Sequence, residues 1–354
     1  MKILYLFNKV RAGGSELENI HSGKGHDNHF YGMLRLRKYG IETDFLEIEQ
    51  FVPLWFALFL RRFVFNIFWV HLPLFPLFFK YDIVFSSTAY GPLLIKAIFG
   101  VKKFKWVMLD FNISGTIGGR RTLRQKIFYY AVSKTDGIIT ISEEEVSALE
   151  KLFPHLRGRI KFLHEGIDTE FFKPQASIDE ERFILSVGRD PSRDFKTLIE
   201  ATTGLGVRVK LATKREMVKN LEPLPPYVSV EHFSHDEMLR QYSKAAIVVI
   251  GLKLKQKAPN DSMGTFAVAE AMSMGKAVIA SKTNALASYI EDGVTGVLVP
   301  IGDVSALNRA IKNLMFDETK RHSMGRRARE YAQNKFSADI FAEGLAKFFK
   351  TLKP

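Results

Sequence analysis

Residues 260–303 read NDSMGTFAVAEAMSMGKAVIASKTNALASYIEDGVTGVLVPIGD, and this stretch decides the fold. Its apolar spacing predicts a helix over 266–274 that carries one acid, Glu270, among small and apolar neighbours. Buried parallel strands are expected at 277–280 and 296–300, each bounded by glycine. Strand ends and helix N-termini that meet at one edge of a parallel sheet bind anionic ligands. The stretch therefore predicts an anion site on an α/β fold.

The rest of the chain repeats this alternation of strand and helix in two halves. Strict alternation of this kind predicts parallel sheets covered by helices on both faces. A chain of 354 residues also exceeds what one core usually organises, so two domains are expected. We predict strands at 2–7, 43–48, 83–86, 105–109, 137–141 and 160–163, and then at 183–187, 208–212, 228–231, 246–250, 277–280 and 296–300. The expected domains are residues 1–172 and 173–335, with a terminal helix in 336–354 that returns to the first domain.

Composition limits the classes of function. The absence of cysteine excludes disulfides, thiolate chemistry and Cys-ligated zinc, which is consistent with a reducing compartment. The first seven residues form an apolar segment too short for a signal peptide, so a cytoplasmic protein is expected. The net charge of +13 requires a polyanionic neighbour or a solubility role. Nucleic acid is disfavoured, because no helix-turn-helix, zinc-finger or RNP pattern is present.

Residues 51–79, FVPLWFALFLRRFVFNIFWVHLPLFPLFF, form an unusually aromatic stretch. Arg61 and Arg62 lie in its middle, which argues against a transmembrane span. One interpretation is a buried pair of helices in the first domain. The other is an in-plane amphipathic helix on an anionic bilayer, with Arg61, Arg62 and Lys80 at the lipid phosphates. In that second interpretation the aromatic residues entering the lipid boundary are Trp55, Phe56, Phe59, Phe63 and Trp69.

Four motifs occur in an order that resembles the family 4 retaining glycosyltransferases, or glycosyl transferases group 1. In residues 260–303, Glu270 falls on the second glutamate of the family's pair, which lies eight residues after the first. Each of the other motifs is short, and their common order along the chain carries the resemblance. These motifs are Gly13-Gly14-Ser15-Glu16, His164-Glu165-Gly166-Ile167-Asp168 with Phe171 and Pro174, and Val187-Gly188-Arg189 with Thr197-Leu198-Ile199-Glu200-Ala201.

The resemblance implies a GT-B fold, in which two Rossmann-like domains face each other across a cleft. It also implies a retaining, metal-independent transferase that moves a hexose or amino sugar from a nucleoside diphosphate of UDP or GDP type. No cofactor is expected beyond this substrate. A lipid-linked acceptor or a surface-glycan precursor is expected, with the enzyme on the inner face of the plasma membrane. The alternatives are a catalytically silent nucleotide-sugar binding protein and, more remotely, an epimerase or phosphorylase on the same scaffold.

The leaving nucleoside diphosphate gains negative charge, so cations and backbone N–H groups must meet it. Arg189 follows a strand directly and Arg193 lies four residues on, where the family has an Arg and a Lys. We assign both to the diphosphate; the alternative is that they pair with Asp190 and Asp194 on a solvated loop. By resemblance, Glu270 accepts the ribose hydroxyls. The remaining residues assigned to donor binding are Gly13, Gly14, Ser262, Gly264, Thr265 and Phe266.

The chain departs from the family pattern at four places, one of which is Gly275-Lys276-Ala277-Val278 where the family has a Gly-x-Pro-Val turn. Counting eight residues back from Glu270 reaches Ser262 in place of the first glutamate, with Asp261 beside it. After the fourth strand, where family members often carry a histidine, Asp110 or Asn112 is expected to face the sugar. The stretch after Gly14 contains His21, His26 and His29, for which a mobile loop is favoured over a metal site. No metal is therefore predicted.

Overall fold

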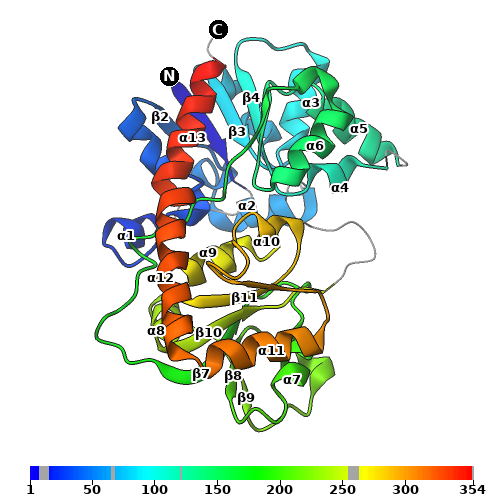
Figure 1. The fold of residues 1–354 in the computed structure, drawn as a ribbon. Coiled ribbons are helices and arrows are strands. Elements are labelled where there is room, and N and C mark those ends of the chain that lie inside the picture. Colours follow the sequence, from blue (N-terminus) through cyan, green and yellow to red (C-terminus); the bar gives the residue numbers. More distant parts are fainter. Residues whose placement is uncertain (8–15, 65–67, 120–121, 254–262, 353–354) are drawn as a thin grey trace. The chain divides into compact units, whose positions relative to one another are not determined.

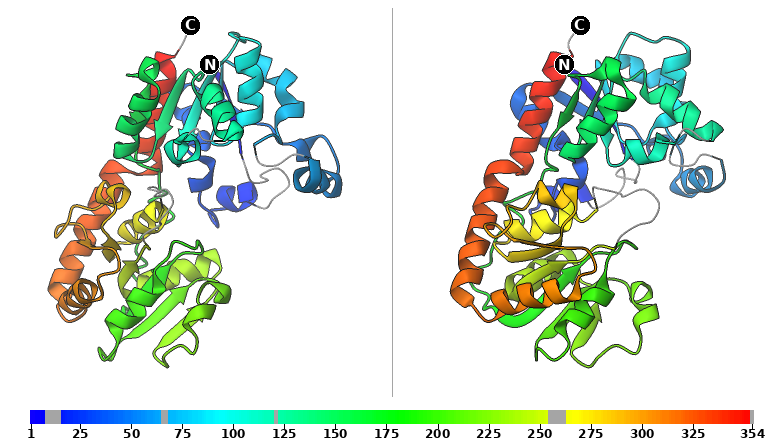
Figure 2. Two further views of the ribbon diagram at one scale, coloured as in Figure 1. Left: turned by 90° about the vertical axis from the view of Figure 1, so that its right-hand side faces the viewer. Right: turned by 45° about the vertical axis from the view of Figure 1, so that its right-hand side comes forward.

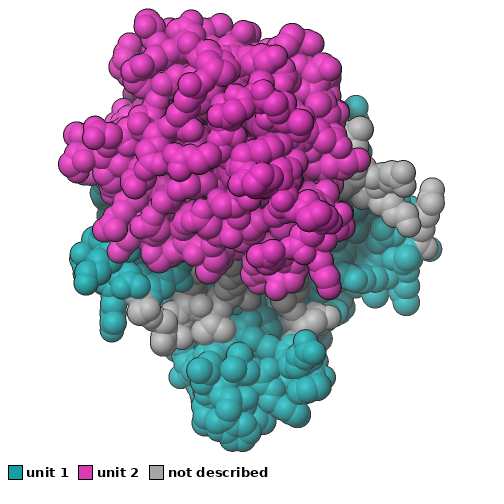
Figure 3. Space-filling model, turned by 90° about the horizontal axis from the view of Figure 1, so that it is seen from below, with its two compact units in different colours: residues 1–166, 338–354 teal, residues 167–337 magenta. Residues whose placement is uncertain are grey.

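The computed structural model describes residues 1–7, 16–64, 68–119, 122–253 and 263–352. The chain forms two compact units, one of residues Met1–Gly166 with Ala338–Pro354 and one of residues Ile167–Ser337 (Figures 1 and 3). The sequence placed the boundaries after residues 172 and 335. Ile167 and Phe172 are buried in the core of the second unit, which is why this unit begins before residue 173.

The first unit contains a six-stranded parallel sheet in the order β2-β1-β3-β4-β5-β6. Its strands are β1 Lys2–Leu6, β2 Glu42–Phe45, β3 Ile83–Ser86, β4 Lys105–Asp110, β5 Gly137–Thr140 and β6 Ile160–Phe162. All six match predicted strands, although β2 ends three residues early because Ile48 begins a 3-10 turn. Successive residues point to opposite faces: Leu4 enters one core, whereas Ile3 enters the other.

Helices cover both faces of this sheet (Figure 2). The α-helices are α1 Glu16–His21, α2 Leu54–Phe59, α3 Tyr90–Ile98, α4 Ile113–Ile117, α5 Leu123–Val132, α6 Glu143–Leu152 and α13 Ala338–Thr351. Short helical turns are η1 Asn28–Phe30, η2 Met33–Tyr39, η3 Ile48–Gln50, η5 Leu72–Lys80 and η6 Pro154–Leu156, with a π-helical turn, η4, at Leu60–Val64. No helix in the ranges that the structure describes is long and apolar enough to cross a bilayer.

The second unit contains another six-stranded parallel sheet, in the order β12-β11-β10-β7-β8-β9. Its strands are β7 Glu181–Val187, β8 Arg208–Ala212, β9 Val228–Glu231, β10 Ala245–Ile250, β11 Ala277–Ser281 and β12 Val297–Val299, and each overlaps a predicted strand. From β7 the chain moves outward to β8 and β9, and then returns to the other side of β7 with β10. The topological switch point, where such sheets bind ligands, therefore lies at the carboxyl ends of β7 and β10.

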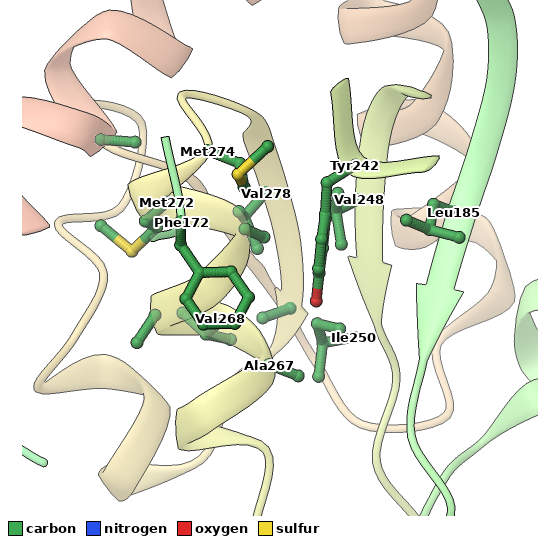
Figure 4. Packing of buried hydrophobic residues seen from close by; sticks show 14 of the residues in the cluster. Phe172, Leu185, Tyr242, Val248, Ile250, Ala267, Val268, Met272, Met274 and Val278 are labelled. Carbon is green, nitrogen blue, oxygen red and sulfur yellow. The ribbon is translucent and has the colours of Figure 1, made fainter. Parts of the chain in front are cut away.

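Two hydrophobic cores flank this sheet. Leu185, Val248 and Val278 pack toward α9 and α12 (Figure 4), whereas their neighbours Ile184 and Ile247 pack toward α7 and α11. The helices are α7 Phe195–Thr202, α8 His235–Lys244, α9 Thr265–Ser273, α10 Asn284–Ala287, α11 Val304–Met315 and α12 Glu318–Lys335, with short turns η7 Arg215–Met217 and η8 Lys219–Leu221. The predicted helix over 266–274 is α9, displaced by one residue.

The terminal helix expected in residues 336–354 is α13, which begins at Ala338. The chain leaves the helical path between α12 and α13, where the Phe336 carbonyl accepts a hydrogen bond from Ile167 N–H at 2.9 Å. The Phe336 side chain is buried in the core of the second unit. Phe341 and Phe349 are instead buried in the first unit, where Phe349 contacts Phe85 edge-on at 5.4 Å between ring centroids. The phenylalanines therefore serve two different cores.

Candidate nucleotide-sugar site

The loop after β7 lies against the segment after β10, at the switch point of the second sheet. Arg193 and Leu252 form an antiparallel bridge, and Asp194 N–H donates to the Gly251 carbonyl at 3.0 Å. These backbone contacts hold the loop at the carboxyl edge of the sheet. Arg193, assigned from the sequence to the diphosphate, is therefore placed where ligands bind in sheets of this topology.

Two glycines make room for the Arg193 side chain. A Cβ on Gly188 would lie 1.8 Å from Arg193 Nε, and one on Gly264 would lie 3.0 Å from Nη1. Any larger residue at position 188 would therefore displace the guanidinium group. The backbone at Gly188 has φ 151° and at Gly264 φ 89°, and side chains strain both conformations. The glycine at the end of β7 and the glycine before α9 thus fit the arginine that lies beside them.

The Arg193 guanidinium group is buried without full hydrogen bonding. Its residue is 6% exposed, and burial lowers its pKa. Nε lies 3.2 Å from Asp190 Oδ2, a charge contact that lacks hydrogen-bond geometry. Within the described part of the chain, Nε and Nη1 have no hydrogen-bond acceptor. Such orphaned donors cost free energy, and an anionic ligand would offset that cost.

Only one of the acids named in the solvated-loop alternative pairs with an arginine, because Asp190 forms an ion pair with the buried Arg193 and Asp194 forms none. Asp194 caps α7, where its carboxylate accepts from Thr197 N–H at 3.1 Å and from the Thr197 hydroxyl at 2.6 Å. Asp190 is the partner of Arg193 and accepts from Ser192 N–H at 3.0 Å. Arg189 is exposed, and no ion pair joins it to another described residue. Of the two predicted cations, one is buried in the loop and the other projects from it.

The N-terminus of α9 lies at the same edge of the sheet. Gly264 precedes the helix in a left-handed conformation, and its carbonyl accepts from Val268 N–H at 3.0 Å. Thr265 and Phe266, which the sequence analysis assigned to binding of the nucleotide sugar, occupy the first turn, and Thr265 is buried. The positive end of the helix dipole and the buried arginine are therefore adjacent, an arrangement that favours a phosphate group.

One turn further along α9, Glu270 receives a hydrogen bond from the Tyr242 hydroxyl at 2.9 Å. Burial raises the pKa of Glu270 to about 7, and the Tyr242 hydrogen bond and the charge of Arg193 oppose this rise. Figure 4 shows the Tyr242 ring beside Val248, with its hydroxyl directed toward Ile250. Glu270 is thus linked electrostatically to the arginine and keeps one carboxylate oxygen for another donor.

Tyr242 is a residue of the candidate site that the sequence analysis missed. It lies near the end of α8, 28 residues before Glu270, and its side chain is fully buried. The amphipathic pattern of α8 marks it only as a core position, because nothing local to the sequence indicates a buried carboxylate as its partner. Burial and Glu270 raise the pKa of the Tyr242 hydroxyl well above its ordinary value, so it acts as a donor.

Asp110 lies in the first unit, at the end of β4. Its Oδ1 accepts from Ile113 N–H at 2.5 Å, and Oδ2 has no hydrogen-bond acceptor or donor among the described residues. Burial and the nearby Glu145 raise the pKa of Asp110 to about 8. Asn112 caps α4 by accepting from Gly115 N–H at 3.1 Å. Asp110 is therefore a buried carboxylic acid held at a strand end, and it is one of the two residues that the sequence analysis expected to face the sugar.

Other predicted residues cannot be placed. Gly13, Gly14, Asp261 and Ser262 lie outside the described residues. The stretch expected to be a mobile loop is partly helical, since His21 ends α1 and His29 lies on η1, and the rings of His26 and His29 have centroids 5.2 Å apart. Across the described ranges, no group of three or more His, Asp or Glu side chains could hold a metal ion.

Comparison with solved structures assigns the fold class. HepE of Anabaena, in complex with UDP and glucose, superposes with a TM-score of 0.70 at 17% identity over 99% of this chain and 100% of that chain. Sucrose-phosphate synthase of Thermosynechococcus elongatus superposes with a TM-score of 0.70 at 17% identity over 99% and 98% of the two chains. Two parallel six-stranded α/β units with these neighbours define a GT-B fold, as expected.

Residues 168–331 match the sequence model of the family described as Glycosyl transferases group 1. The second unit is therefore a glycosyl transferases group 1 domain. The chain is 24% identical over 276 residues to an uncharacterized glycosyltransferase of Methanocaldococcus jannaschii, covering 77% of this chain and 76% of that protein. It is 25% identical over 252 residues to a D-inositol 3-phosphate glycosyltransferase of Kribbella flavida, covering 62% of this chain and 57% of that protein. These relatives support a transferase.

Proposed function

We propose that the protein is a retaining, metal-independent glycosyltransferase that uses a nucleoside-diphosphate hexose or amino sugar of UDP or GDP type. The observation that carries this proposal is the buried guanidinium group of Arg193, which lacks hydrogen-bond acceptors beside the N-terminus of α9. A diphosphate leaving group supplies the missing acceptors and gains charge as its bond to the sugar breaks. HepE, which has the same fold, was solved with UDP and glucose.

We expect the diphosphate and the ribose of the nucleotide sugar to lie one after the other along the switch-point edge of the second sheet. Arg193, together with the exposed Arg189, neutralises the diphosphate, so no divalent ion is required. Backbone N–H groups at Thr265 and Phe266 face the same phosphates. Glu270, with one oxygen committed to Tyr242, accepts hydrogen bonds from the ribose hydroxyls. We retain Gly13, Gly14 and Ser262 as further donor contacts on the strength of the motifs alone.

Retention of anomeric configuration follows the family resemblance. In the front-face mechanism, the oxygen of the leaving diphosphate takes the proton of the attacking acceptor hydroxyl. The protein then has to hold the diphosphate and the sugar, and a pair of catalytic carboxylates is not needed. Asp110 is proposed to position the sugar or the acceptor hydroxyl as a neutral acid, since its pKa near 8 keeps it protonated at pH 7.

Arg193 provides the direct test. Arg193→Met should reduce the transfer rate from UDP- and GDP-sugars by on the order of 10²-fold or more, through lost stabilisation of the leaving group. Arg193→Lys keeps the charge, loses the bidentate guanidinium and introduces the residue that the resembled family has at this position, so it is the matched control and should lose less of the rate than Arg193→Met. Product analysis by NMR reports the anomeric configuration. Equal rates in wild type and Arg193→Met would refute the assignment, and an inverted product would refute retention.

A second candidate is a nucleotide-sugar binding protein without transferase activity. The sequence favours it at one position, because Ser262 replaces the first glutamate of the family pair. One assay distinguishes the two functions, because both an enzyme and a binding protein bind the nucleotide sugar but only the enzyme releases nucleoside diphosphate. Donor binding without hydrolysis or transfer, across a panel of lipid-linked and free glycan acceptors, would select the binding protein.

We further propose a lipid-linked or surface-glycan acceptor, at an anionic membrane surface on the cytoplasmic side. The observation is the α2 patch, a row of exposed apolar side chains on α2 and η4 that includes Trp55 at 72% and Phe63 at 73% exposure. Apolar groups that remain exposed together on one helix mark a contact surface. The patch consists of Leu54, Trp55, Leu58, Phe59, Phe63 and Val64.

The structure divides the aromatic stretch between the two interpretations. Leu74 and Phe78 on η5 are buried in the core, whereas the α2 patch is exposed. Arg61 does not reach outward as the membrane interpretation expected, because it donates to the buried carboxylate of Glu49 at 3.0 Å. Trp69 is also not exposed, and a Cβ on Gly91 would lie 2.4 Å from its ring. Among the lipid-facing cations that the sequence proposed, Arg62 and Lys80 remain exposed.

Liposome sedimentation tests the membrane proposal. Adsorption should increase with the anionic lipid fraction and decrease with salt, because exposed charges are screened beyond about 8 Å at physiological ionic strength. Trp55→Ser with Phe63→Ser should abolish adsorption and leave donor affinity unchanged. Phe99→Ser with Leu123→Ser removes similarly exposed apolar groups elsewhere in the first unit and serves as the control. A wild-type protein that stays in the supernatant at low salt would refute the proposal.

A further inference from the structure

A second hollow lies in the second unit, at the opposite end of α9 from Gly264. Its volume is about 540 Å³, which is within the range of small-molecule sites. Its wall comprises the turn Met274–Lys276 after α9, one face of α12 and the segment that precedes β7. Ser243 at the end of α8 completes the lining. The hollow is separate from the proposed nucleotide-sugar site, because that site lies at the N-terminal end of α9 and the hollow lies at the C-terminal end.

The charge of the hollow favours an anion. Arg326 on α12 is exposed, and no described residue forms an ion pair with it. Lys276 is 9% exposed and donates from Nζ to the Ser243 carbonyl at 2.7 Å. Glu180 also lines the hollow, but its charge is balanced by Arg321 at 2.6 Å and by Lys276 at 3.5 Å. Glu330 and Arg329 also line the hollow, so its three cationic side chains outnumber its two carboxylates and the net charge of the lining is positive.

Ser243, one of the lining residues, has a buried hydroxyl without a partner. Ser243 is 6% exposed, and its Oγ forms no hydrogen bond with any residue that the structure describes. A buried hydroxyl of this kind costs free energy until it finds a partner. Pro174, Ile178 and Met274 supply an apolar wall beside it. Together these groups match a ligand that carries an anionic group, hydroxyl groups and a ring with an apolar face.

We propose that this hollow binds a sugar phosphate, with the phosphate on Arg326 and Lys276 and a sugar hydroxyl on Ser243, and that occupancy changes the affinity of the donor site. The connection between the two sites is short. Ser243 directly follows Tyr242, whose hydroxyl donates to Glu270, and Met274 N–H donates to the Glu270 carbonyl at 2.9 Å. A ligand in the hollow would contact Ser243 and Met274, which adjoin these two hydrogen bonds to Glu270. It would therefore act on Glu270, the residue that we propose to bind the ribose. This coupling rests on the proposed donor site, whereas binding in the hollow does not.

Binding is tested first, with glucose 6-phosphate as the probe. Millimolar glucose 6-phosphate should raise the unfolding temperature by about 2 °C, and glucose should not. Arg326→Gln should weaken the affinity at least about tenfold. Lys320→Gln removes an exposed charge from α12 outside the hollow, so it should change the affinity less than about twofold. No shift in the wild type, or equal affinities in the Arg326 and Lys320 variants, would refute the site.

Ser243→Ala distinguishes a ligand role from a structural role. Removal of an unpartnered buried hydroxyl should leave the unliganded unfolding temperature unchanged or raised, while the shift from glucose 6-phosphate should fall. A variant that loses unliganded stability and keeps the full shift would assign Ser243 to the fold alone.

Coupling is tested by titrating UDP with and without saturating glucose 6-phosphate. The UDP affinity should change by at least about threefold, and UDP should change the glucose 6-phosphate affinity by the same factor. Competitive displacement would place the probe in the donor site and refute the proposal, and independent binding would refute the coupling. A protein that shows the glucose 6-phosphate shift but does not bind nucleotide sugars would refute the proposed function and leave this site intact.

Discussion

Donor binding should release a proton from Glu270. With a pKa of about 7, most Glu270 side chains are protonated near pH 6 and most are ionised near pH 8. Ribose hydroxyls donate to a carboxylate, so the donor binds the ionised form. The Kd for UDP-glucose should therefore decrease about tenfold between about pH 6 and pH 8, which corresponds to about 1.4 kcal/mol. UDP-glucose is preferred to UDP because its diphosphate is a diester and does not titrate in this range.

The same pKa has the opposite effect on the stability of the free protein. The unfolded chain releases the Glu270 proton near its ordinary pKa of 4.5, whereas the folded chain holds it until about 7. Stability is therefore lost as the pH rises through this window. The loss has an upper bound of about 3 kcal/mol, because each pKa unit corresponds to about 1.4 kcal/mol. Glu270→Gln should remove this slope from the urea midpoint measured against pH.

Isothermal titration calorimetry provides the assay. Titrations near pH 6.5 in two buffers of different ionisation enthalpy report the number of protons released, which should be about three-quarters of a proton per UDP-glucose, since that fraction of Glu270 is protonated in the free protein at this pH. In Glu270→Gln the release should disappear, and the affinity loss of roughly 1 to 3 kcal/mol expected near pH 8 should shrink near pH 6. Tyr242→Phe removes a hydrogen bond that lowers the Glu270 pKa, so its profile should move to higher pH. A flat wild-type profile, or one unchanged in Glu270→Gln, would refute the reasoning.

Three further predictions concern the fold and the site. Gly188→Ala should weaken UDP-glucose binding more than about tenfold, because the new Cβ displaces Arg193. Gly204→Ala is the control: Gly204 also has positive φ but has open space around it, so calorimetry should find the same affinity as in wild type. Phe336→Ala should lower the free energy of unfolding by about 3 to 5 kcal/mol in urea denaturation, and the exposed Phe316→Ala by less than about 1; equal losses would contradict the packing described for α12. Asp110→Asn should gain stability over wild type as the pH rises from about 4 to 8, because the raised pKa of Asp110 makes wild-type stability decline across that window; parallel profiles of urea midpoint against pH would show that Asp110 ionises normally.

Much of the fold could be predicted because its signals are local. β3 is a short buried run of mostly apolar residues, whereas β8 alternates the charged Arg208 and Lys210 with buried apolar residues, and the sequence located both strands with their observed bounds. Alternation of strands with helices then restricts the topology to doubly wound sheets. Errors occurred where a residue's surroundings come from elsewhere in the chain. The phenylalanines after residue 335 share a helical spacing, yet Phe336 and Phe341 belong to different cores.

The candidate site was predicted in part for the same reason. Arg193 and Glu270 are found from strand ends and motif spacing, which are properties of adjacent residues. Their chemistry is not local: Gly188 and Gly264 admit the arginine from two separate loops, and Tyr242 reaches Glu270 from another helix. Spacing along the chain carries no information about such partners.

By itself, the sequence determined the α/β class, located the strands of both sheets and indicated the sheet edge at which we propose that an anion binds, because backbone propensity and hydrophobic period act over a few residues. Only the tertiary structure decided which polar groups are buried away from solvent. It buried the Arg193 guanidinium without acceptors, raised the pKa of Glu270 and left the α2 patch exposed. The physical reason is desolvation, which depends on every segment packed around a group and therefore on the complete fold.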